Sequence, residues 1–283
     1  FNKSKIDKIN LDDYLPPASD AKESDEDSEA KKAETVQKET DKPSEILNFP
    51  YLNPQNGPIF INGAEKGDAL AVYIEDIRPR GPEPSGTTVL IPEFGGLVAT
   101  AETALLNKPL PERVKKVEID VNTGIKWNNK ISLPYEPFIG TIGTSPEIEA
   151  ISALVPDYYG GNMDLPDICL DTVIYLPVNL RGAYLYLGDC HATQGDGELS
   201  GVAIEHPTTT TIQIDLIKNW AIETPRLENK DFYMTIGSAR PMEDATRQAY
   251  RELVRWLAAD FGFEELEAYM FLSQAGRVRL GNM

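Results

Sequence analysis

The sequence is poor in cysteine, in histidine and in basic residues. Two cysteines, Cys169 and Cys190, among 283 residues are too few for a disulfide scaffold and indicate a reducing compartment, so we expect a cytoplasmic protein. The two histidines, His191 and His206, exclude a zinc site with three histidine ligands. With 27 Lys and Arg against 45 Asp and Glu, the net charge is -18, which argues against nucleic acid and anionic membrane as partners.

Long apolar runs are also missing. No stretch approaches the roughly 20 apolar residues that span a bilayer, and no signal-peptide pattern opens the given residues. The balance of 41% hydrophobic and 25% charged residues excludes collagen, coiled coil and full disorder. We therefore expect a globular protein that binds neither nucleic acid nor membrane.

The composition divides the chain into three parts. Residues 18–45 hold ten acidic and five basic side chains, with Val36 and alanines as their apolar residues. Such a segment cannot offset its ordering entropy by burial, so we predict an acidic linker or surface loop. Residues 1–17 contain a few apolar side chains and are predicted to dock on the main body. Residues 46–283 are predicted to form the functional domain.

The middle of the chain reads as many short strands. Runs rich in β-branched and aromatic residues alternate with Gly and Pro, and no helical period lies between them. The predicted fold class is α+β, with a β-rich, sandwich- or barrel-like body and a C-terminal helical pair. The predicted strands cover residues 58–63, 69–77, 87–92, 116–121, 130–134, 172–178, 183–189, 201–206 and 209–217.

The C-terminal part has a helical pattern. After Pro241, apolar residues recur three or four positions apart at Ala245, Ala249, Leu253 and Trp256, which predicts an amphipathic helix. A second, shorter helix is predicted near 263–274. Residues 277–280 alternate in polarity, as at the start of a further strand.

One segment combines metal-ligand side chains with turn residues. If a strand through Asp189 and His191 turns at 194–197 and pairs residue 191 with 200, alternation places Asp189, His191 and Glu198 on one face. Two carboxylates and an imidazole there form a candidate divalent-metal site. An oxygen and nitrogen ligand set favours zinc, with calcium as the alternative. The other interpretation is a polar hairpin tip exposed to water.

A second polar cluster precedes this segment. Tyr159-Gly160-Gly161-Asn162-Met163-Asp164 contains two glycines that permit an unusual backbone path. Asn162 and Asp164 are two positions apart, so an extended chain would direct both side chains the same way. The alternative is a turn in which these side chains bond to their own backbone.

The ordered run of these motifs resembles the acetamidase/formamidase family. GGNMD, then IYLPV, then GD-x-HA-x-QGDGE match its pattern, as do Asn53-Pro54-Gln55-Asn56-Gly57-Pro58, PFIGTIGTSP, YMTIG and EAYMFLSQAGRVRL. The similarity extends over about residues 48–280. Asn53 stands where many members have His. The resemblance implies a β-rich α+β fold, a bound metal, a homo-oligomer and hydrolysis of short amides such as formamide or acetamide.

We assign roles to individual residues from the predicted pairing and from the chemistry that amide hydrolysis requires. Asp189, His191 and Glu198 are the expected core ligands, with Asn162 and Asp164 as further ligands or as groups that orient the first set. Asp196, or a carboxylate of this set that does not bind the metal, is expected to transfer the proton, and Gln194 to stabilise the oxyanion. Two alternatives stay open: a β-rich metal- or ligand-binding protein without catalysis, and a hydrolase with Cys190 as nucleophile.

Overall fold

The computed structural model describes residues 7–10, 42–47, 51–92, 94–97 and 110–283. Most of the predicted acidic segment 18–45 therefore lies outside the described residues, as does most of the predicted docking segment 1–17. Within that docking segment, β1 (Asp7–Asn10) pairs antiparallel with β12. The predicted division into three parts stays a prediction.

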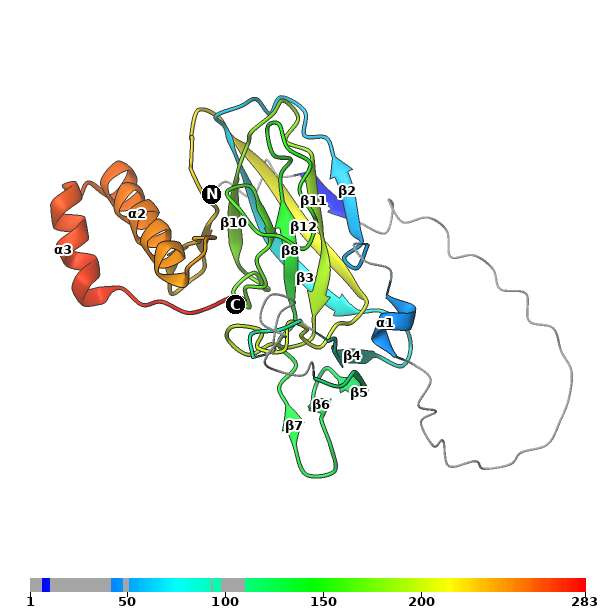
Figure 1. Cartoon of the computed structure of the whole chain (residues 1–283). Coiled ribbons are helices and arrows are strands. Elements are labelled where there is room, and N and C mark those ends of the chain that lie inside the picture. The colour runs from blue at the N-terminus through cyan, green and yellow to red at the C-terminus, as the bar shows by residue number, and fades with distance from the viewer. Residues whose placement is uncertain (1–6, 11–41, 48–50, 93, 98–109) are drawn as a thin grey trace, which may run out of the picture.

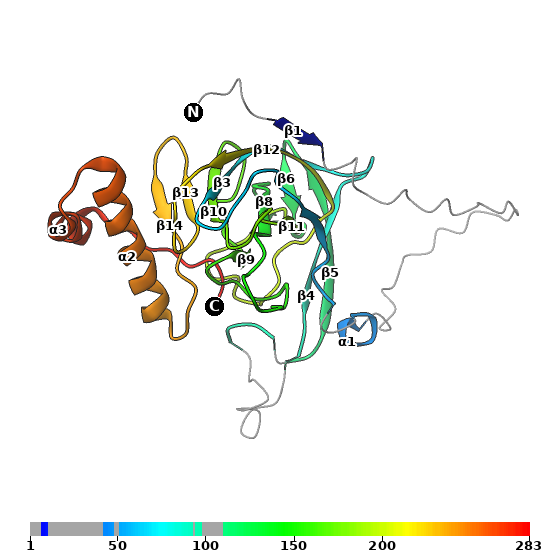
Figure 2. The same cartoon turned by 90° about the horizontal axis from the view of Figure 1, so that it is seen from above.

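Fourteen strands of the described chain form three antiparallel sheets (Figures 1 and 2). The six-stranded sheet has the order β1-β12-β3-β10-β13-β14, and the four-stranded sheets have the orders β2-β11-β8-β9 and β4-β5-β6-β7. Beyond β1, the strands are β2 (Gln55–Ile59), β3 (Ala69–Pro79), β4 (Ser85–Leu90), β5 (Arg113–Asp120), β6 (Gly124–Lys126), β7 (Ser132–Leu133), β8 (Phe138–Gly143), β9 (Gly160–Asn162), β10 (Val173–Pro177), β11 (Leu185–His191), β12 (Thr208–Ile217), β13 (Arg226–Glu228) and β14 (Tyr233–Thr235).

The main core lies between the six-stranded sheet and the sheet that contains β8 and β11. Its fully buried aliphatic residues come from β3, β8, β10 and β11, at alternate positions in β3, β10 and β11, as expected for two sheets packed face to face. They include Leu70, Val72, Ile142, Ile174 and Leu185. This packing makes β8 and β11 rigid neighbours, which matters because both strands contribute to the candidate site.

In the described part of the chain three helices accompany the sheets: α1 (Pro43–Ile46), α2 (Met242–Phe261) and α3 (Glu265–Ala275). None of them combines the length and the apolar character that crossing a bilayer requires. Gly262, with φ of 75°, ends α2 in the left-handed conformation that favours glycine at a helix C-terminus. The predicted fold class, a β-rich body with a C-terminal helical pair, is confirmed.

Two of the predicted strands are wrong. Residues 201–206 form no strand and contribute a bridge at Glu205 alone, while 277–280 follow α3 in an extended path outside any sheet. A run with β-branched residues predicted the first segment and alternating polarity the second. Glu205 bridges Thr87 and His191, but this pairing does not extend into a strand, and 277–280 pair with no strand among the described residues. The two helices lie together beside the β10–β14 end of the body (Figure 1).

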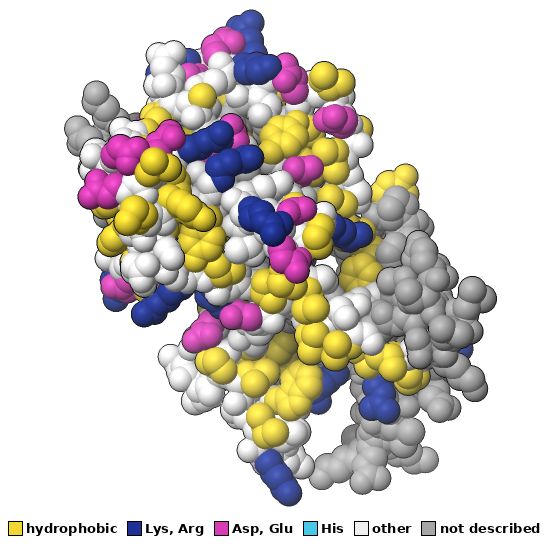
Figure 3. All heavy atoms as spheres, turned by 60° about the vertical axis from the view of Figure 1, so that its left-hand side comes forward, with side chains coloured by type: hydrophobic (Ala, Val, Ile, Leu, Met, Phe, Trp, Pro, Cys, Tyr) yellow, Lys and Arg dark blue, Asp and Glu magenta, His cyan; other side chains and the backbone are white. Residues whose placement is uncertain are grey.

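Hydrophobic side chains also lie on the outside of the helical pair. Leu266, Tyr269 and Met270 of α3 are each about two-thirds exposed, and Figure 3 brings this side of the molecule forward, with apolar side chains among acidic ones. Exposed apolar groups of this extent are typical of association surfaces. The predicted homo-oligomer stays a prediction.

A buried ion pair attaches α2 to the sheet. Arg226 of β13 donates to Glu252 of α2 from Nε at 2.9 Å and Nη2 at 2.8 Å, and both side chains are almost fully buried. The guanidinium also lies over the rings of Trp220 and Trp256, at 4.9 and 5.0 Å from their centroids. The charge is thus held between two aromatic faces and the Glu252 carboxylate, with Oδ2 of Asp260 3.9 Å from Nη1.

We predict that Glu252→Ala destabilises the protein by about 3–5 kcal/mol, because it removes the hydrogen-bonded partner of the buried Arg226 charge and leaves only the longer contact with Asp260. The matched control is Glu223→Ala, which removes an exposed ion pair with Arg255 and should change stability by less than about 1 kcal/mol. Denaturant unfolding measures both. Equal losses in the two variants would contradict the role assigned to the buried pair.

Asp68 ties the turn before β3 to the end of β12. Its carboxylate accepts hydrogen bonds from the backbone N–H groups of Glu65 at 2.8 Å and Asn219 at 2.9 Å, and from the ammonium group of Lys218. Burial opposes ionisation of this side chain, but the Lys218 and backbone hydrogen bonds prevail and lower the pKa of Asp68 below its usual value.

A lowered folded-state pKa means that this carboxylate stabilises the fold above the unfolded pKa of about 3.9 and loses that effect as the pH falls through the folded value. We therefore expect Asp68→Asn to cost about 1–3 kcal/mol at neutral pH. The difference from the parent should shrink below about pH 4. Unfolding curves of parent and variant at several pH values measure it, and a penalty that does not vary with pH would refute the assignment.

Candidate metal centre

Three strands of one sheet position the polar cluster. In β8, Thr141 pairs with Asn162 of β9 and with Gly188 of β11, so the two predicted motifs meet across this strand. His191 ends β11 opposite Phe138 and packs edge-on against its ring, with the centroids 4.8 Å apart. The sheet therefore brings GGNMD and GD-x-HA together, although Asn162 and His191 are far apart in the sequence.

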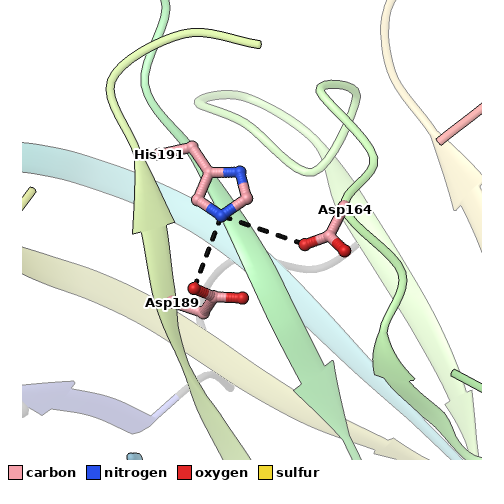
Figure 4. A group of neighbouring side chains, drawn as sticks. All are labelled: Asp164, Asp189 and His191. Carbon is pink, nitrogen blue, oxygen red and sulfur yellow. Dashed lines mark ion pairs between the residues drawn. The ribbon is translucent and has the colours of Figure 1, made fainter. Parts of the chain in front are cut away.

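Asp164, Asp189 and His191 converge from two segments (Figure 4). The Nε2 atom of His191 lies 3.4 Å from Oδ1 of Asp189 and 3.9 Å from Oδ1 of Asp164. A second group of possible metal ligands consists of the same imidazole, Glu198 and Glu205. The Oε2 atom of Glu205 lies 3.2 Å from Nε2 of His191. Four carboxylates thus surround one imidazole, and each group of ligand atoms lies within 4.8 Å.

Backbone strain accompanies this arrangement. Asp164, Asp189 and Glu198 have φ angles of 48°, 59° and 42°, in the left-handed region that side chains other than glycine seldom adopt. Such conformations persist where the surrounding structure enforces them, and they gather at functional sites. They also interrupt the alternation of side chains along the chain, so spacing alone cannot place these residues.

Gln194 sets the protonation pattern of the imidazole. Its Nε2 donates to the backbone oxygens of Asp164 at 2.8 Å and Gly281 at 3.0 Å, so its Oε1 is the atom that meets Nδ1 of His191, also at 2.8 Å. Nδ1–H of His191 therefore donates, and Nε2 faces the carboxylates. Both amide hydrogens of Gln194 are used, which leaves none for the predicted oxyanion.

Two buried atoms of the cluster have no hydrogen-bond partner in the described structure: Oδ1 of Asp164 and Nε2 of His191. Gly140 leaves open the space beside them, because a Cβ at this position would lie 2.8 Å from the first atom and 2.9 Å from the second. Buried polar atoms are normally satisfied. An oxygen, a nitrogen and an open space between them fit a divalent cation.

The charges of the cluster are unbalanced. Burial raises the pKa of Asp164 to about 7, and burial together with Asp164 raises the pKa of Glu198 to about 9. Burial also works against a charged His191, yet Glu205 and Asp189 raise its pKa well above its usual value. For Asp189 burial is outweighed by the nearby His191 imidazole and by the hydrogen bond from Thr141, which lower its pKa. The site thus requires protons or a cation.

An outer layer of amides and hydroxyls holds the carboxylates. Asn162 donates from Nδ2 to Oδ2 of Asp164 at 2.9 Å, while its Oδ1 accepts from Thr141 and from Asn53. Asn53 also donates to Oδ2 of Asp189 at 3.3 Å. Because both ends of the Asn162 amide are engaged in this way, its contacts favour the orienting role over the ligand role.

The predicted strand pairing around this site is wrong. His191 bridges Glu205 instead of Ser200, and Ala192 donates to the backbone oxygen of Ile204 at 2.8 Å. The loop that joins His191 to Glu205 is longer than the predicted turn, and the chain changes direction within it at Glu198. Glu205 is the residue that sequence reasoning missed, and its one signal is a lone carboxylate at the end of the apolar run VAI.

Two predicted residues lie away from the cluster. Asp196 is exposed, and its Oδ1 accepts from Nη2 of Arg279 at 2.5 Å. Cys190 directs its sulfur toward Thr210 of β12, 3.8 Å from the hydroxyl oxygen, and burial raises the pKa of its thiol. A thiol held in its protonated form beside β12 does not suit the nucleophile alternative.

The chain is similar to a known protein family and to several solved structures. A family model described as "Acetamidase/Formamidase family" matches residues 148–281. The crystal structure of acetamidase from Yersinia enterocolitica superposes with a TM-score of 0.84 and 57% identity, covering 88% of this chain and 75% of that one. Acetamidase from Bacillus halodurans gives a TM-score of 0.77 and 32% identity, covering 88% and 80%.

The chain belongs to the acetamidase/formamidase family. The resemblance read from the motifs is confirmed. The acetamidase of Mycolicibacterium smegmatis is a more distant member, 27% identical over 245 residues. The chain spans 58% of that relative and 53% of another from Schizosaccharomyces pombe, so it covers little more than half their length.

We predict that Gly140→Ala fills the space at the centre of the site. The added methyl group would contact Asp164 and His191 at less than 3 Å, so affinity for a divalent metal should fall by at least about 10-fold. Gly195→Ala is the matched control, because nothing lies within 4 Å of a Cβ there. Metal content by mass spectrometry and circular dichroism test this. Unchanged metal content in folded Gly140→Ala would contradict it.

Proposed function

We propose that this chain is a metal-dependent amidohydrolase that converts short linear amides such as formamide or acetamide to ammonia and a carboxylate. The observation that supports it best is the pair of buried atoms without a partner, Oδ1 of Asp164 and Nε2 of His191, beside the open space at Gly140. Membership of the family supports the substrate class, since its Yersinia and Bacillus members are named acetamidases.

Asp164, Asp189, His191 and Glu198 would hold the cation in this proposal. Zinc suits them better than calcium, because one donor is an imidazole nitrogen and calcium binds oxygen almost alone. A bound divalent ion polarises an amide carbonyl and makes a water molecule acidic enough to supply hydroxide near neutral pH. The hydrogen bond from Nδ1 of His191 to Gln194 keeps Nε2 directed at the site.

We assign proton transfer to a carboxylate that reaches solvent. Glu205 lies 3.2 Å from Nε2 of His191, and its side chain is 36% exposed, whereas those of Asp164 and His191 are about 1% exposed. Overall, water adds its hydroxyl group to the carbonyl carbon, its remaining proton goes to the amide nitrogen, and the C–N bond breaks to give the carboxylic acid and ammonia. We propose that Glu205 takes the proton from water and returns it to the nitrogen. In this proposal Glu205 takes the proton-transfer role that was predicted for Asp196, which is exposed and paired with Arg279.

The test measures ammonia release from formamide, acetamide and propionamide. We expect activity in the metal-loaded protein, loss on chelation and recovery when zinc is added back. His191→Ala should lower both metal affinity and the rate by about 100-fold or more, because it removes the nitrogen donor of the cluster.

His206→Gln is the control for this substitution. Its ring contacts Tyr135 and the backbone oxygen of Cys190, outside the cluster, so metal content and rate should stay at parental values. Metal binding without ammonia release from any short amide would favour the non-catalytic alternative. Activity that survives complete chelation would refute the metal-dependent mechanism.

A further inference from the structure

The chain returns from the helical pair to the candidate metal centre. After α3 it runs back to the body and ends beside β9 (Figures 1 and 2). Residues 279–282, which we name the strap, contact both loops that contain predicted ligands. One is the loop of Asp164, after β9, and the other is the loop of Glu198, after β11.

Asn282 contacts a candidate ligand directly. Its Nδ2 donates to Oδ2 of Asp164 at 2.8 Å and to the backbone oxygen of Asn162 at 3.2 Å. Oδ2 of Asp164 also accepts from Asn162 at 2.9 Å. Two amide donors thus occupy one oxygen of the carboxylate, and the other oxygen, Oδ1, is left facing Nε2 of His191.

Arg279 joins the two loops. Its Nη1 donates to both oxygens of Asp167 at 3.1 and 3.0 Å, and its Nε and Nη2 donate to Oδ1 of Asp196 at 3.0 and 2.5 Å. Asp167 lies three residues after Asp164, and Asp196 lies two residues before Glu198. The planar guanidinium therefore spans the gap between two ligand-bearing loops, a geometry that lysine cannot reproduce.

The backbone of the strap adds further contacts. The N–H of Gly197 lies 3.1 Å from the carbonyl oxygens of both Leu280 and Gly281, and Gln194 donates to the latter as well. A Cβ on Gly281 would lie 2.5 Å from the backbone oxygen of Met163, so the strap packs closely against the Asp164 loop. The same Gln194 amide orients His191, which connects the strap to the imidazole too.

From these contacts we propose that the strap is part of the metal centre, with Asn282 as a positioning residue that orients the Asp164 carboxylate. Arg279 holds the two ligand loops at a fixed separation. This inference rests on the proposed function, because it assigns the strap a role toward the same cation. It also makes the site depend on the path of the chain beyond α3, outside every motif that bears ligands.

Loss of Asn282 would leave Oδ2 of Asp164 with one amide donor, Asn162, instead of two. The carboxylate could then turn about its terminal bond, and ordering it again would oppose metal binding. Groups that orient metal ligands typically contribute 10- to 100-fold in metal affinity, and we expect about this loss for Asn282→Ala. Arg279→Gln, at a side chain that is 44% exposed, should give a smaller loss in the same direction.

The experiment measures the zinc dissociation constant by competition with a chromophoric chelator, in the full chain. The matched control is Asn229→Ala, since the Asn229 side chain also makes two hydrogen bonds, here as an acceptor from the backbone N–H groups of Asp231 and Phe232, in an exposed turn between β13 and β14. We expect the control to equal the parent and Asn282→Ala to bind about 10- to 100-fold more weakly. The visible absorption of the cobalt-loaded protein should also change in Asn282→Ala, because the Asp164 oxygen that faces the metal moves.

Unfolding of the metal-free proteins separates positioning from support of the fold. If Asn282 positions Asp164, metal-free Asn282→Ala should be nearly as stable as the metal-free parent. A zinc dissociation constant equal to that of Asn229→Ala, or a weaker affinity fully matched by a loss of metal-free stability, would overturn the proposal. A parent that binds no divalent metal would refute the proposed function and this inference together, whereas unchanged affinity in the variant refutes the inference alone.

Discussion

The structure around β8, β9 and β11 depends on one electrostatic constraint. Four carboxylates surround a single buried imidazole, and the cluster contains more negative charge than its own groups can neutralise. In a medium of low polarity such an excess must be met by protons or by a cation. The outer layer of amides, the left-handed backbone at three acidic residues and the glycine at the centre all follow from bringing these groups together while leaving room between them.

The packing of the two larger sheets keeps these charged groups close together. The aliphatic core between the two larger sheets fixes β8 against β11, so the polar groups at their ends cannot relax apart. The outer amides complete the arrangement from distant places: Asn53 precedes β2, Asn162 ends β9 and Asn282 lies beyond α3. Each contributes a donor to a carboxylate oxygen, and together they decide which oxygen faces the centre.

Several features could be predicted from local patterns. The helical pair followed from apolar residues three or four positions apart, and most strands followed from β-branched runs bounded by Gly and Pro. Of the segments that failed, 201–206 has an apolar run whose pairing is limited to bridges at Glu205, and 277–280 has the right alternation but no strand pairing. Pairing depends on partners distant in sequence, and alternation within a segment contains no information about them.

The sequence by itself determined which residues could form the site: one histidine in reach, a run of acids near it and glycines that permit sharp turns. It also determined the family, because the motifs stand in a fixed order along the chain. Tertiary structure alone decided which acids converge. It turned Asp196 outward to Arg279, brought in Glu205 from beyond the loop and placed Asn282 against Asp164. The physical reason is that left-handed residues such as Asp189 and Glu198 interrupt strand alternation, so only the folded chain sets the direction of these side chains.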